Sequence, residues 1–312
     1  MASAAIETRG LTKYYGPVVG LENLSLDVAQ GEVFGFLGAN GAGKTTTIRI
    51  LLDLVRPTSG SASILGFDCH RQGLEARRRV GYLPGDMPFY PELTGARYLR
   101  FLSSLGDSRP SPSQMEFLLR RFDVSDLDLN RRMRDYSHGM KRKLGLIQAL
   151  MTEPQVLILD EPTSGLDPLM IEAFSETVDE LARSGRTTVF LSSHILSEVD
   201  RICQRIGLVR GGRLVAVRTL SELRAAAPRR MTVMFSMPVN GDMPALPGAT
   251  LVTREPARWV LDVQGPLGDI IPQLGHLPVV DVQLAAFTLD EAILRLLGHV
   301  QKDGPYQAAS KP

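Results

Sequence analysis

Cysteine is scarce in this 312-residue chain, which contains only Cys69 and Cys203. Two cysteines are too few for a disulfide framework or a thiolate metal site, and they favour a reducing compartment. Aromatic residues make up 6% of the chain, too few to provide stacking platforms for bases beside its basic runs. The net charge of +1 gives no overall attraction to nucleic acid or to an acidic membrane surface. We therefore expect no nucleic-acid partner.

Long apolar runs are also absent. No stretch reaches the roughly 18 consecutive apolar residues that a membrane-spanning helix needs. The first residues, which include Glu7 and Arg9, lack the continuous apolar region of a secretory signal. With 44% hydrophobic and 22% charged residues, the composition is typical of a globular protein that buries a sizeable core.

Short β-rich runs alternate with helical patterns over residues 1–218, which predicts an α/β unit with a largely parallel sheet. Compact apolar runs without alternation predict buried strands at residues 33–37, 156–159 and 187–191. Residues 24–28 alternate between apolar and polar, which predicts a half-exposed strand nearer an edge. Apolar residues recur at helical spacing after Ser137, after Asp167 and after His194.

Residues 92–135 contain no clear strand and predict a helical insertion, so that a helical subdomain extends over about 92–150. A composition shift follows Leu223, and residues 225–230 are typical of a linker or of a helix end. Beyond them, strands are predicted at 232–237, 259–263 and 279–284, followed by a capping box that opens a helix at 288–297. We expect a small α+β domain over 219–312 with a frayed tail.

A phosphate-binding loop is predicted between the first buried strand and a helix at 46–54. Glycines let successive backbone N–H groups turn toward phosphate oxygens, and the helix N-terminus adds partial positive charge. In this pattern Lys44 reaches the β- and γ-phosphates and the Thr45 hydroxyl binds Mg²⁺. An ordinary glycine-rich turn is the weaker alternative. The residues expected to bind the nucleotide here are Gly38, Ala39, Asn40, Gly41, Ala42, Gly43, Lys44, Thr45 and Thr46.

Two carboxylates, Asp160 and Glu161, end the second buried strand. The carboxyl ends of parallel strands are where ligands bind, so Asp160 is expected to hold Mg²⁺ and Glu161 to accept a proton from an attacking water. The alternative is that the two residues cap the following helix.

Three further motifs narrow the class: a serine and a glycine at a helix start (136–140), a loop at 164–167, and Ser192-Ser193-His194 after a strand. Together the five motifs, in this order, resemble the nucleotide-binding subunit of ATP-binding-cassette (ABC) transporters over residues 4–217. The resemblance implies a phosphate-loop NTPase fold with an antiparallel edge sheet. It also implies that two cassettes close head to tail around ATP.

The resemblance assigns roles to further residues. Tyr15 resembles the aromatic residue that stacks on adenine, although an ordinary strand residue is an open alternative. Ser137 and Gly139 resemble residues that bind the partner's ATP, and Asp167 one that crosses the interface. His194 resembles the histidine that contacts the γ-phosphate, which makes Lys44, Glu161 and His194 the expected catalytic residues.

The sequence departs from the family at three positions. His138 and Met140 replace a usual glycine and glutamine, but Ser137 and Gly139 remain. At Gly85 the family has a glutamine that binds Mg²⁺ and couples the site to the membrane subunit, and glycine has no side chain for either task. We hypothesise that Asp86 substitutes as a metal ligand.

We therefore expect the ATP-hydrolysing subunit of an ABC exporter of a drug, antibiotic or lipid, at the cytoplasmic face of the cell membrane. Its expected partners are a separate membrane-spanning permease and a second cassette, either a copy of this chain or a paralogue. The alternatives are a soluble ABC ATPase that acts on nucleic acid or ribosomes, and a module that binds ATP without hydrolysing it. The presence of Glu161 favours hydrolysis.

Overall fold

The computed structural model describes residues 4–87, 89–106, 109–226, 229–239 and 244–285. The chain divides into two compact units, Met1–Thr219 and Leu220–Pro312. The helix predicted at 288–297 and the frayed tail lie outside the described residues.

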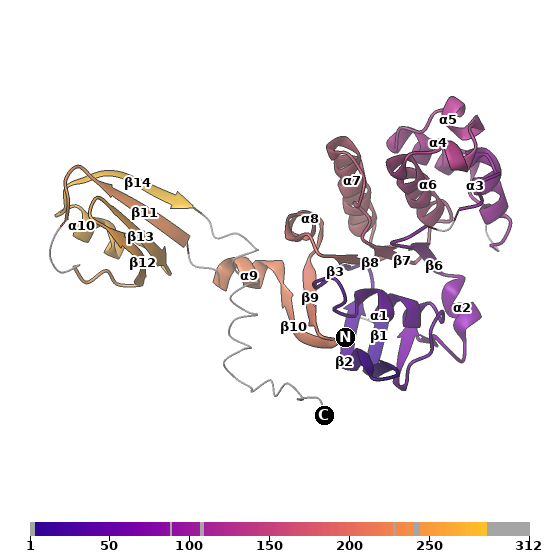
Figure 1. Cartoon of the computed structure of the whole chain (residues 1–312), viewed down its shortest axis with the longest axis horizontal. Helices are drawn as coiled ribbons and strands as arrows, with labels where there is room; N and C mark the ends of the chain where they lie inside the picture. The colour runs from indigo at the N-terminus through magenta and orange to yellow at the C-terminus, as the bar shows by residue number, and fades with distance from the viewer. Residues whose placement is uncertain (1–3, 88, 107–108, 227–228, 240–243, 286–312) are drawn as a thin grey trace. The chain divides into compact units, whose positions relative to one another are not determined.

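A six-stranded sheet with strand order β10-β9-β3-β8-β7-β6 forms the centre of the first unit (Figure 1). Its strands from β9 to β6 run parallel, and β10 pairs antiparallel with β9. Every residue of β3, β7 and β8 is buried, which confirms that the three apolar runs form strands covered on both faces. The strands are β3 Val33–Leu37, β6 Val80–Leu83, β7 Val156–Asp160, β8 Thr188–Ser193, β9 Arg205–Arg210 and β10 Arg213–Thr219.

A second sheet of the same unit is antiparallel, with strand order β2-β1-β4-β5. The predicted edge strand is β2, in which Leu24, Leu26 and Val28 are buried and alternate with more exposed neighbours. Its strands are β1 Ala4–Tyr15, β2 Val18–Ala29, β4 Ser59–Ile64 and β5 Phe67–Asp68. The α/β fold with an antiparallel edge sheet is thereby confirmed.

Helix α1 (Lys44–Leu51) packs against strands of both sheets. It begins two residues before the predicted helix and ends three residues earlier. The backbone before it, at Gly43, is left-handed with φ 111°, so the helix begins directly at Lys44. Asp53 is also left-handed, with φ 56°, which prevents the helix from continuing.

Helices between β6 and β7 confirm the predicted helical insertion, and Figure 1 shows them gathered beside α7. Serine or threonine side chains cap α3, α4, α5 and α6 by accepting a backbone N–H, a strong helix-start signal. None of the helices in the described part of the chain is long and apolar enough to cross a membrane. The helices of the first unit after α1 are α2 Gly73–Arg77, α3 Gly95–Ser103, α4 Pro112–Arg121, α5 Asp126–Asn130, α6 His138–Leu150, α7 Pro168–Ser184 and α8 Leu196–Ile202.

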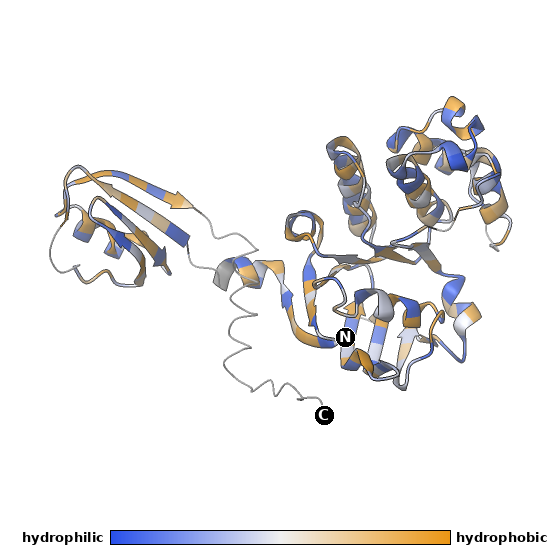
Figure 2. Ribbon diagram, in the orientation of Figure 1, coloured by the Kyte–Doolittle hydropathy of each residue, from blue (hydrophilic) through white to orange (hydrophobic). Residues whose placement is uncertain are grey.

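Figure 2 shows hydrophobic and hydrophilic residues mixed along α7, as the predicted apolar stripe requires. Phe174 and Val178 of that stripe are buried. Amphipathic helices of this kind cover the hydrophobic faces of the central sheet.

The second unit contains an antiparallel sheet of order β12-β13-β11-β14. Phe235 and Trp259 meet edge to face in its core, with ring centroids 4.8 Å apart. Strand β12 was not predicted, because most of its side chains are exposed and it lacks a compact apolar run. The elements are α9 Leu220–Ala226, β11 Arg229–Phe235, β12 Ala249–Glu255, β13 Arg258–Val263, α10 Ile271–Leu274 and β14 Val279–Ala285.

Residues 225 and 226 end α9, as the helix-end alternative predicts, and residues 227–228 lie outside the described ones. The linker prediction is also wrong for residues 229 and 230. Arg229 and Arg230 belong to β11 and pair with Val263 and Asp262 of β13. The Arg230 guanidinium lies 3.1 Å from the Asp262 carboxylate, so a cross-strand ion pair offsets the weak strand preference of arginine.

Aromatic packing holds β3 against β8. Phe190 lies 5.9 Å from Phe34 and 5.3 Å from Phe36 between ring centroids, and all three side chains are fully buried. The interior is close-packed, so a truncated Phe190 would leave a cavity between the two strands.

We expect Phe190→Ala to lower the free energy of unfolding by about 3–5 kcal/mol, from the lost transfer energy and the new cavity. Urea denaturation followed by circular dichroism measures this change. Leu127→Ala is the control, because Leu127 is 80% exposed and its loss should change stability by less than about 0.5 kcal/mol. Equal effects of the two substitutions would contradict the prediction.

Candidate functional site

The loop between β3 and α1 requires glycine at its ends. Gly41 and Gly43 have positive φ values of 78° and 111°. A Cβ added at Gly38 would lie 2.5 Å from the Val209 carbonyl oxygen, and one at Gly43 would lie 2.8 Å from the Gly20 carbonyl oxygen. Larger residues would therefore clash with neighbouring backbone, so the loop can follow this path only with glycine at these positions.

Lys44 lies at the start of α1 with its side chain 6% exposed. Its ammonium group donates to the carbonyl oxygen of Gly38 at 2.7 Å and lies 3.4 Å from Oε1 of Glu161. The other carboxylate oxygen of Glu161, Oε2, lies 2.7 Å from Nδ1 of His194. Residues that follow β3, β7 and β8 thus form one chain of contacts.

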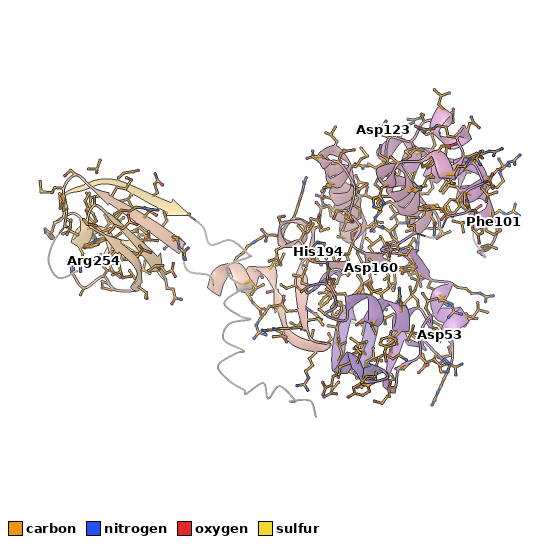
Figure 3. The ribbon with its side chains drawn as sticks, viewed as in Figure 1. Asp53, Phe101, Asp123, Asp160, His194 and Arg254 are labelled. Carbon is orange, nitrogen blue, oxygen red and sulfur yellow. The ribbon has the colours of Figure 1, made fainter. Side chains whose placement is uncertain are left out.

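Asp160 forms a second chain beside the first, and Figure 3 labels it together with His194. The Thr45 hydroxyl donates to Oδ2 of Asp160 at 3.0 Å, and the Ser192 hydroxyl donates to Oδ1. Asp160 is 3% exposed, so these hydrogen bonds replace lost contacts with water. Burial, assisted by the Asp160 charge, raises the pKa of nearby Tyr82 to about 12, which keeps its phenol neutral.

Ser192 was not assigned a role from the sequence. It belongs to the Ser192-Ser193-His194 motif, but its contact with Asp160 depends on the pairing of Asp160 with Ser192 across β7 and β8. A serine near the end of a strand does not by itself indicate a contact with a carboxylate. It does so only when the order of the strands is known, because the order shows which strand end lies beside it.

The oxygen ligands at this point fit Mg²⁺. Thr45 and Asp160 present a hydroxyl and a carboxylate, and Mg²⁺ is normally bound by one or two carboxylates, waters and substrate phosphates. The described residues contain no group of three or more His, Cys, Asp or Glu side chains that would hold a metal. Thr45 and Asp160 would leave the remaining ligand positions of such an ion to a phosphate group and water.

Gly85 faces the same carboxylate. A Cβ added at Gly85 would lie 3.4 Å from Oδ2 of Asp160, so a side chain at this position would point into the site. The neighbouring Asp86 is exposed, and its negative charge acts on Arg142.

Ser137 and Gly139 lie at the start of α6, and Asp167 lies at the start of α7. Ser137 caps α6 by accepting the N–H of Met140 at 3.2 Å, and Asp167 caps α7 in the same way. Because Asp167 caps α7, the alternative in which Asp160 and Glu161 cap the following helix is wrong. A Cβ at Gly139 would lie 2.9 Å from the Gly165 carbonyl oxygen, so the start of α6 contacts the 164–167 loop.

Tyr15 ends β1 and is 42% exposed. Its ring packs on Gly20, where an added Cβ would lie 2.8 Å from the ring, and the Gly20 carbonyl oxygen lies against Gly43. The Lys13 ammonium lies 5.1 Å from the centre of the ring. The tyrosine ring therefore borders the strand that contacts the phosphate-binding loop.

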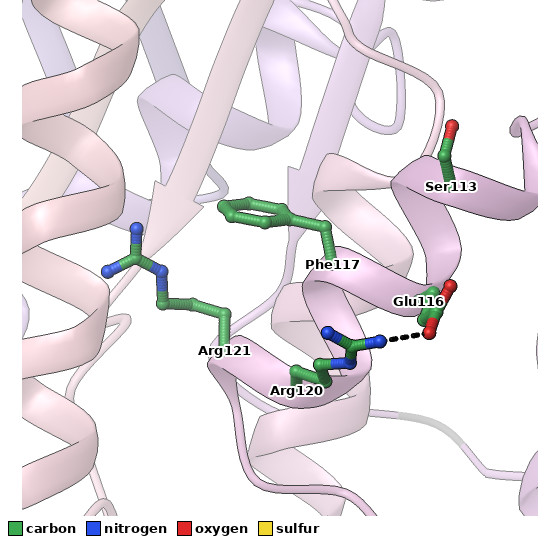
Figure 4. Close-up of a pocket in the computed structure, with 5 residues that line it drawn as sticks. All are labelled: Ser113, Glu116, Phe117, Arg120 and Arg121. Atoms are coloured by element: carbon green, nitrogen blue, oxygen red, sulfur yellow. Dashed lines mark hydrogen bonds and ion pairs between the residues drawn. The ribbon is translucent and has the colours of Figure 1, made fainter.

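A hollow of about 390 Å³ on α4 offers no comparable chemistry (Figure 4). Its Arg120 pairs with Glu116, and its Arg121 pairs with Glu176 and Glu180 of α7. Both guanidinium groups are already paired with carboxylates, and none of the motif residues lines the hollow.

Comparisons with known proteins agree with this geometry. The profile of the family described as "ABC transporter" matches residues 21–164. The chain is 38% identical over 309 residues to the daunorubicin resistance ATP-binding protein DrrA3 of Streptomyces coeruleorubidus, covering 96% of this chain and 97% of that protein. It is 38% identical to the bacitracin transport ATP-binding protein BcrA of Bacillus licheniformis, covering 68% and 69%. A solved ATP-binding subunit of an ABC transporter matches with a TM-score of 0.65 and 33% identity, covering 70% of this chain and 92% of that one.

Proposed function

The chain belongs to the ABC transporter family as an ATP-binding ATPase subunit, and on this basis we propose that it powers export of a drug, antibiotic or lipid through a separate membrane permease. The observation that carries the proposal is the match to DrrA3, because it extends over 96% of the chain and therefore includes both structural units. That relative is named for daunorubicin resistance, and BcrA for bacitracin transport. The chain would act at the cytoplasmic face of the membrane, bound to the permease.

Nucleotide binding rests on the phosphate-binding loop. Lys44 and backbone N–H groups of the loop at 38–45 would bind the β- and γ-phosphates, since a nearly buried ammonium interacts strongly with anionic oxygens. Tyr15 would stack on the adenine ring. Thr45 and Asp160 would hold Mg²⁺, which neutralises phosphate charge when it is bound.

Hydrolysis would use Glu161 as the general base. One oxygen of its carboxylate contacts Lys44 and the other contacts His194, so the group is oriented from both sides. A carboxylate held in this way can accept a proton from a water that attacks the γ-phosphate, while His194 holds that water. These contacts favour a hydrolysing subunit over a module that only binds ATP.

The second binding surface would be supplied by another cassette. Ser137 and Gly139 open α6, whose N-terminus carries partial positive charge suited to a partner's γ-phosphate. Asp167 lies on the loop that contacts this helix start and would cross the interface. The partner would be a second copy of this chain or a paralogue.

We expect Glu161→Gln to lower kcat for ATP hydrolysis by about 10²–10⁴-fold, because the amide cannot accept the proton. ATP binding should persist, and ATP should hold the variant as a dimer in size-exclusion chromatography. Lys44→Ala should instead weaken ATP binding, measured by equilibrium dialysis. Glu172→Gln, an exposed charge loss on α7, is the control. Parental turnover in Glu161→Gln would overturn the assignment of the base.

The metal site yields a second prediction. We propose that Asp86 assists Mg²⁺ binding where a side chain at Gly85 is missing, so Asp86→Ala should raise the Mg²⁺ concentration for half-maximal hydrolysis by about tenfold. Adding Gly85→Gln should restore much of this loss, because position 85 faces Asp160. A Mg²⁺ titration of steady-state ATPase activity measures both changes. An unchanged titration in Asp86→Ala would remove Asp86 from the site.

Export is tested in a drug-sensitive bacterial host that expresses this chain with a candidate permease. We expect the pair to raise the minimal inhibitory concentration of daunorubicin or bacitracin at least about tenfold, and Glu161→Gln to abolish the gain because transport needs hydrolysis. Inside-out vesicles should accumulate the same compound in the presence of ATP. ATPase activity without resistance or uptake of either compound would contradict the proposed cargo class and leave the ATPase assignment intact.

A further inference from the structure

Arg142 is the most completely buried arginine of the described chain, although it stands in the basic run Lys141-Arg142-Lys143. It lies in the second turn of α6 and is 2% exposed. A charge this deeply buried is costly unless hydrogen bonds satisfy it, so its partners reveal what it does in the structure.

The guanidinium group of Arg142 donates to five backbone carbonyl oxygens. Nη1 donates to Pro84 at 2.7 Å and to Gly85 at 3.2 Å, which lie directly after β6. Nε donates to Pro162 at 3.1 Å, and Nη2 donates to Asp160 at 2.7 Å and also to Glu161, all three at or directly after the end of β7. The planar fork of one side chain thus joins α6 to two segments of the catalytic region, and the three donors on the single nitrogen of a lysine could not reproduce these five contacts.

Glu161 needs such support because its backbone is strained. Its φ is 51°, in the left-handed region that residues with a Cβ rarely adopt and keep only when their surroundings hold them there. Its N–H donates to the Ser192 carbonyl oxygen at 3.1 Å, and its own carbonyl oxygen accepts from Arg142 and from the Ser164 N–H, the latter at 3.2 Å. Both polar groups of this residue's backbone are therefore held: the N–H by β8, and the carbonyl oxygen by Ser164 and by the side chain of Arg142, which belongs to α6.

The direction of the Glu161 carboxylate follows from that backbone. From the left-handed conformation the side chain reaches Lys44 at 3.4 Å with one oxygen and His194 at 2.7 Å with the other. A relaxed backbone would turn the Cα–Cβ bond and carry the carboxylate away from both contacts. Small displacements of reacting groups are sufficient to lower catalytic rates strongly.

We propose that Arg142 is a positioning residue for ATP hydrolysis: its guanidinium group holds Glu161 in the left-handed conformation that aims the carboxylate at Lys44 and His194. The proposal rests on the role of Glu161 as general base given above. Arg142 touches neither nucleotide nor water in this scheme. It acts through the carbonyl oxygens of residues 160–162 and, through Pro84 and Gly85, fixes the turn that borders the same carboxylates.

The test compares Arg142→Lys and Arg142→Gln in the whole chain. Lysine keeps the positive charge but lacks the planar guanidinium group. Glutamine keeps a planar N–H donor but lacks the charge, so the two variants separate the loss of geometry from the loss of charge. We expect kcat to fall about 10²-fold in Arg142→Lys, while the Kd for ATP stays within about threefold of the parental value. Arg120→Gln is the matched control, because Arg120 is an exposed arginine of α4 paired with Glu116.

Parallel losses of kcat and ATP binding in both variants, with a lowered Tm, would show a general structural role and overturn the proposal. Parental kcat in either folded variant would overturn it as well. The split between kcat and Kd is the informative readout, since loss of overall folding would lower kcat and raise the Kd for ATP together.

A second measurement asks whether Arg142 acts through Glu161. Arg142→Lys is combined with Glu161→Gln, and single-turnover hydrolysis of labelled ATP is followed. We expect no further loss from Arg142→Lys in the Glu161→Gln background, because residues that act as one unit are not additive. The same 10²-fold loss in that background would overturn the proposal.

Failure of this proposal is distinguishable from failure of the proposed function. An inactive Glu161→Gln variant beside a fully active Arg142→Lys variant would overturn the role of Arg142 alone. A fully active Glu161→Gln variant would overturn the base assignment, and the positioning role of Arg142 with it.

Discussion

The parallel pairing of β3, β8 and β7 is the constraint on which the site depends. Leu37 pairs with Ser193, and Asp160 pairs with Ser192, so the three strands end at one edge of the sheet. Lys44, Glu161 and His194 follow these ends and meet there, although more than a hundred residues separate the first from the other two. A shift of one residue in either pairing would turn the side chains of a strand to the opposite face. The stacked Phe34 and Phe190 rings help hold β3 and β8 in this register.

Three charged side chains are buried near the aligned ends of β3, β7 and β8. Lys44, Asp160 and Arg142 are 6%, 3% and 2% exposed, and each would be costly to bury alone. Lys44 faces a carboxylate, Asp160 accepts two hydroxyl hydrogen bonds, and Arg142 is surrounded by carbonyl oxygens. Charges that are held in fixed positions away from water act strongly on a transferring phosphoryl group and need little reorganisation. The left-handed backbone of Glu161 adds strain at the same place, as is common at functional sites.

Contiguous patterns made several features predictable. The phosphate-binding loop depends on glycines, Lys44 and Thr45 within eight successive positions, and neighbouring backbone enforces the glycines at 38 and 43. The apolar runs of β3, β7 and β8 predict strands that are buried on both faces. In contrast, β12 is mostly exposed and contains no such run. The arginines of β11 are typical of a linker in the sequence, and only their pairing with β13 makes them strand residues.

The sequence by itself determined the class of the protein, the glycine-rich loop between β3 and α1, the acidic end of β7 and the caps that begin α6 and α7, because each is encoded by residues close together in the chain. Only the tertiary structure decided which strand ends are neighbours, and hence that Ser192 meets Asp160 and that His194 meets Glu161. The tertiary structure also decided that Arg142 is buried, although a side chain in a basic run is typically exposed. Burial is set by the segments that pack around a residue, and Pro84 and Pro162, which help enclose this one, lie far from it along the chain.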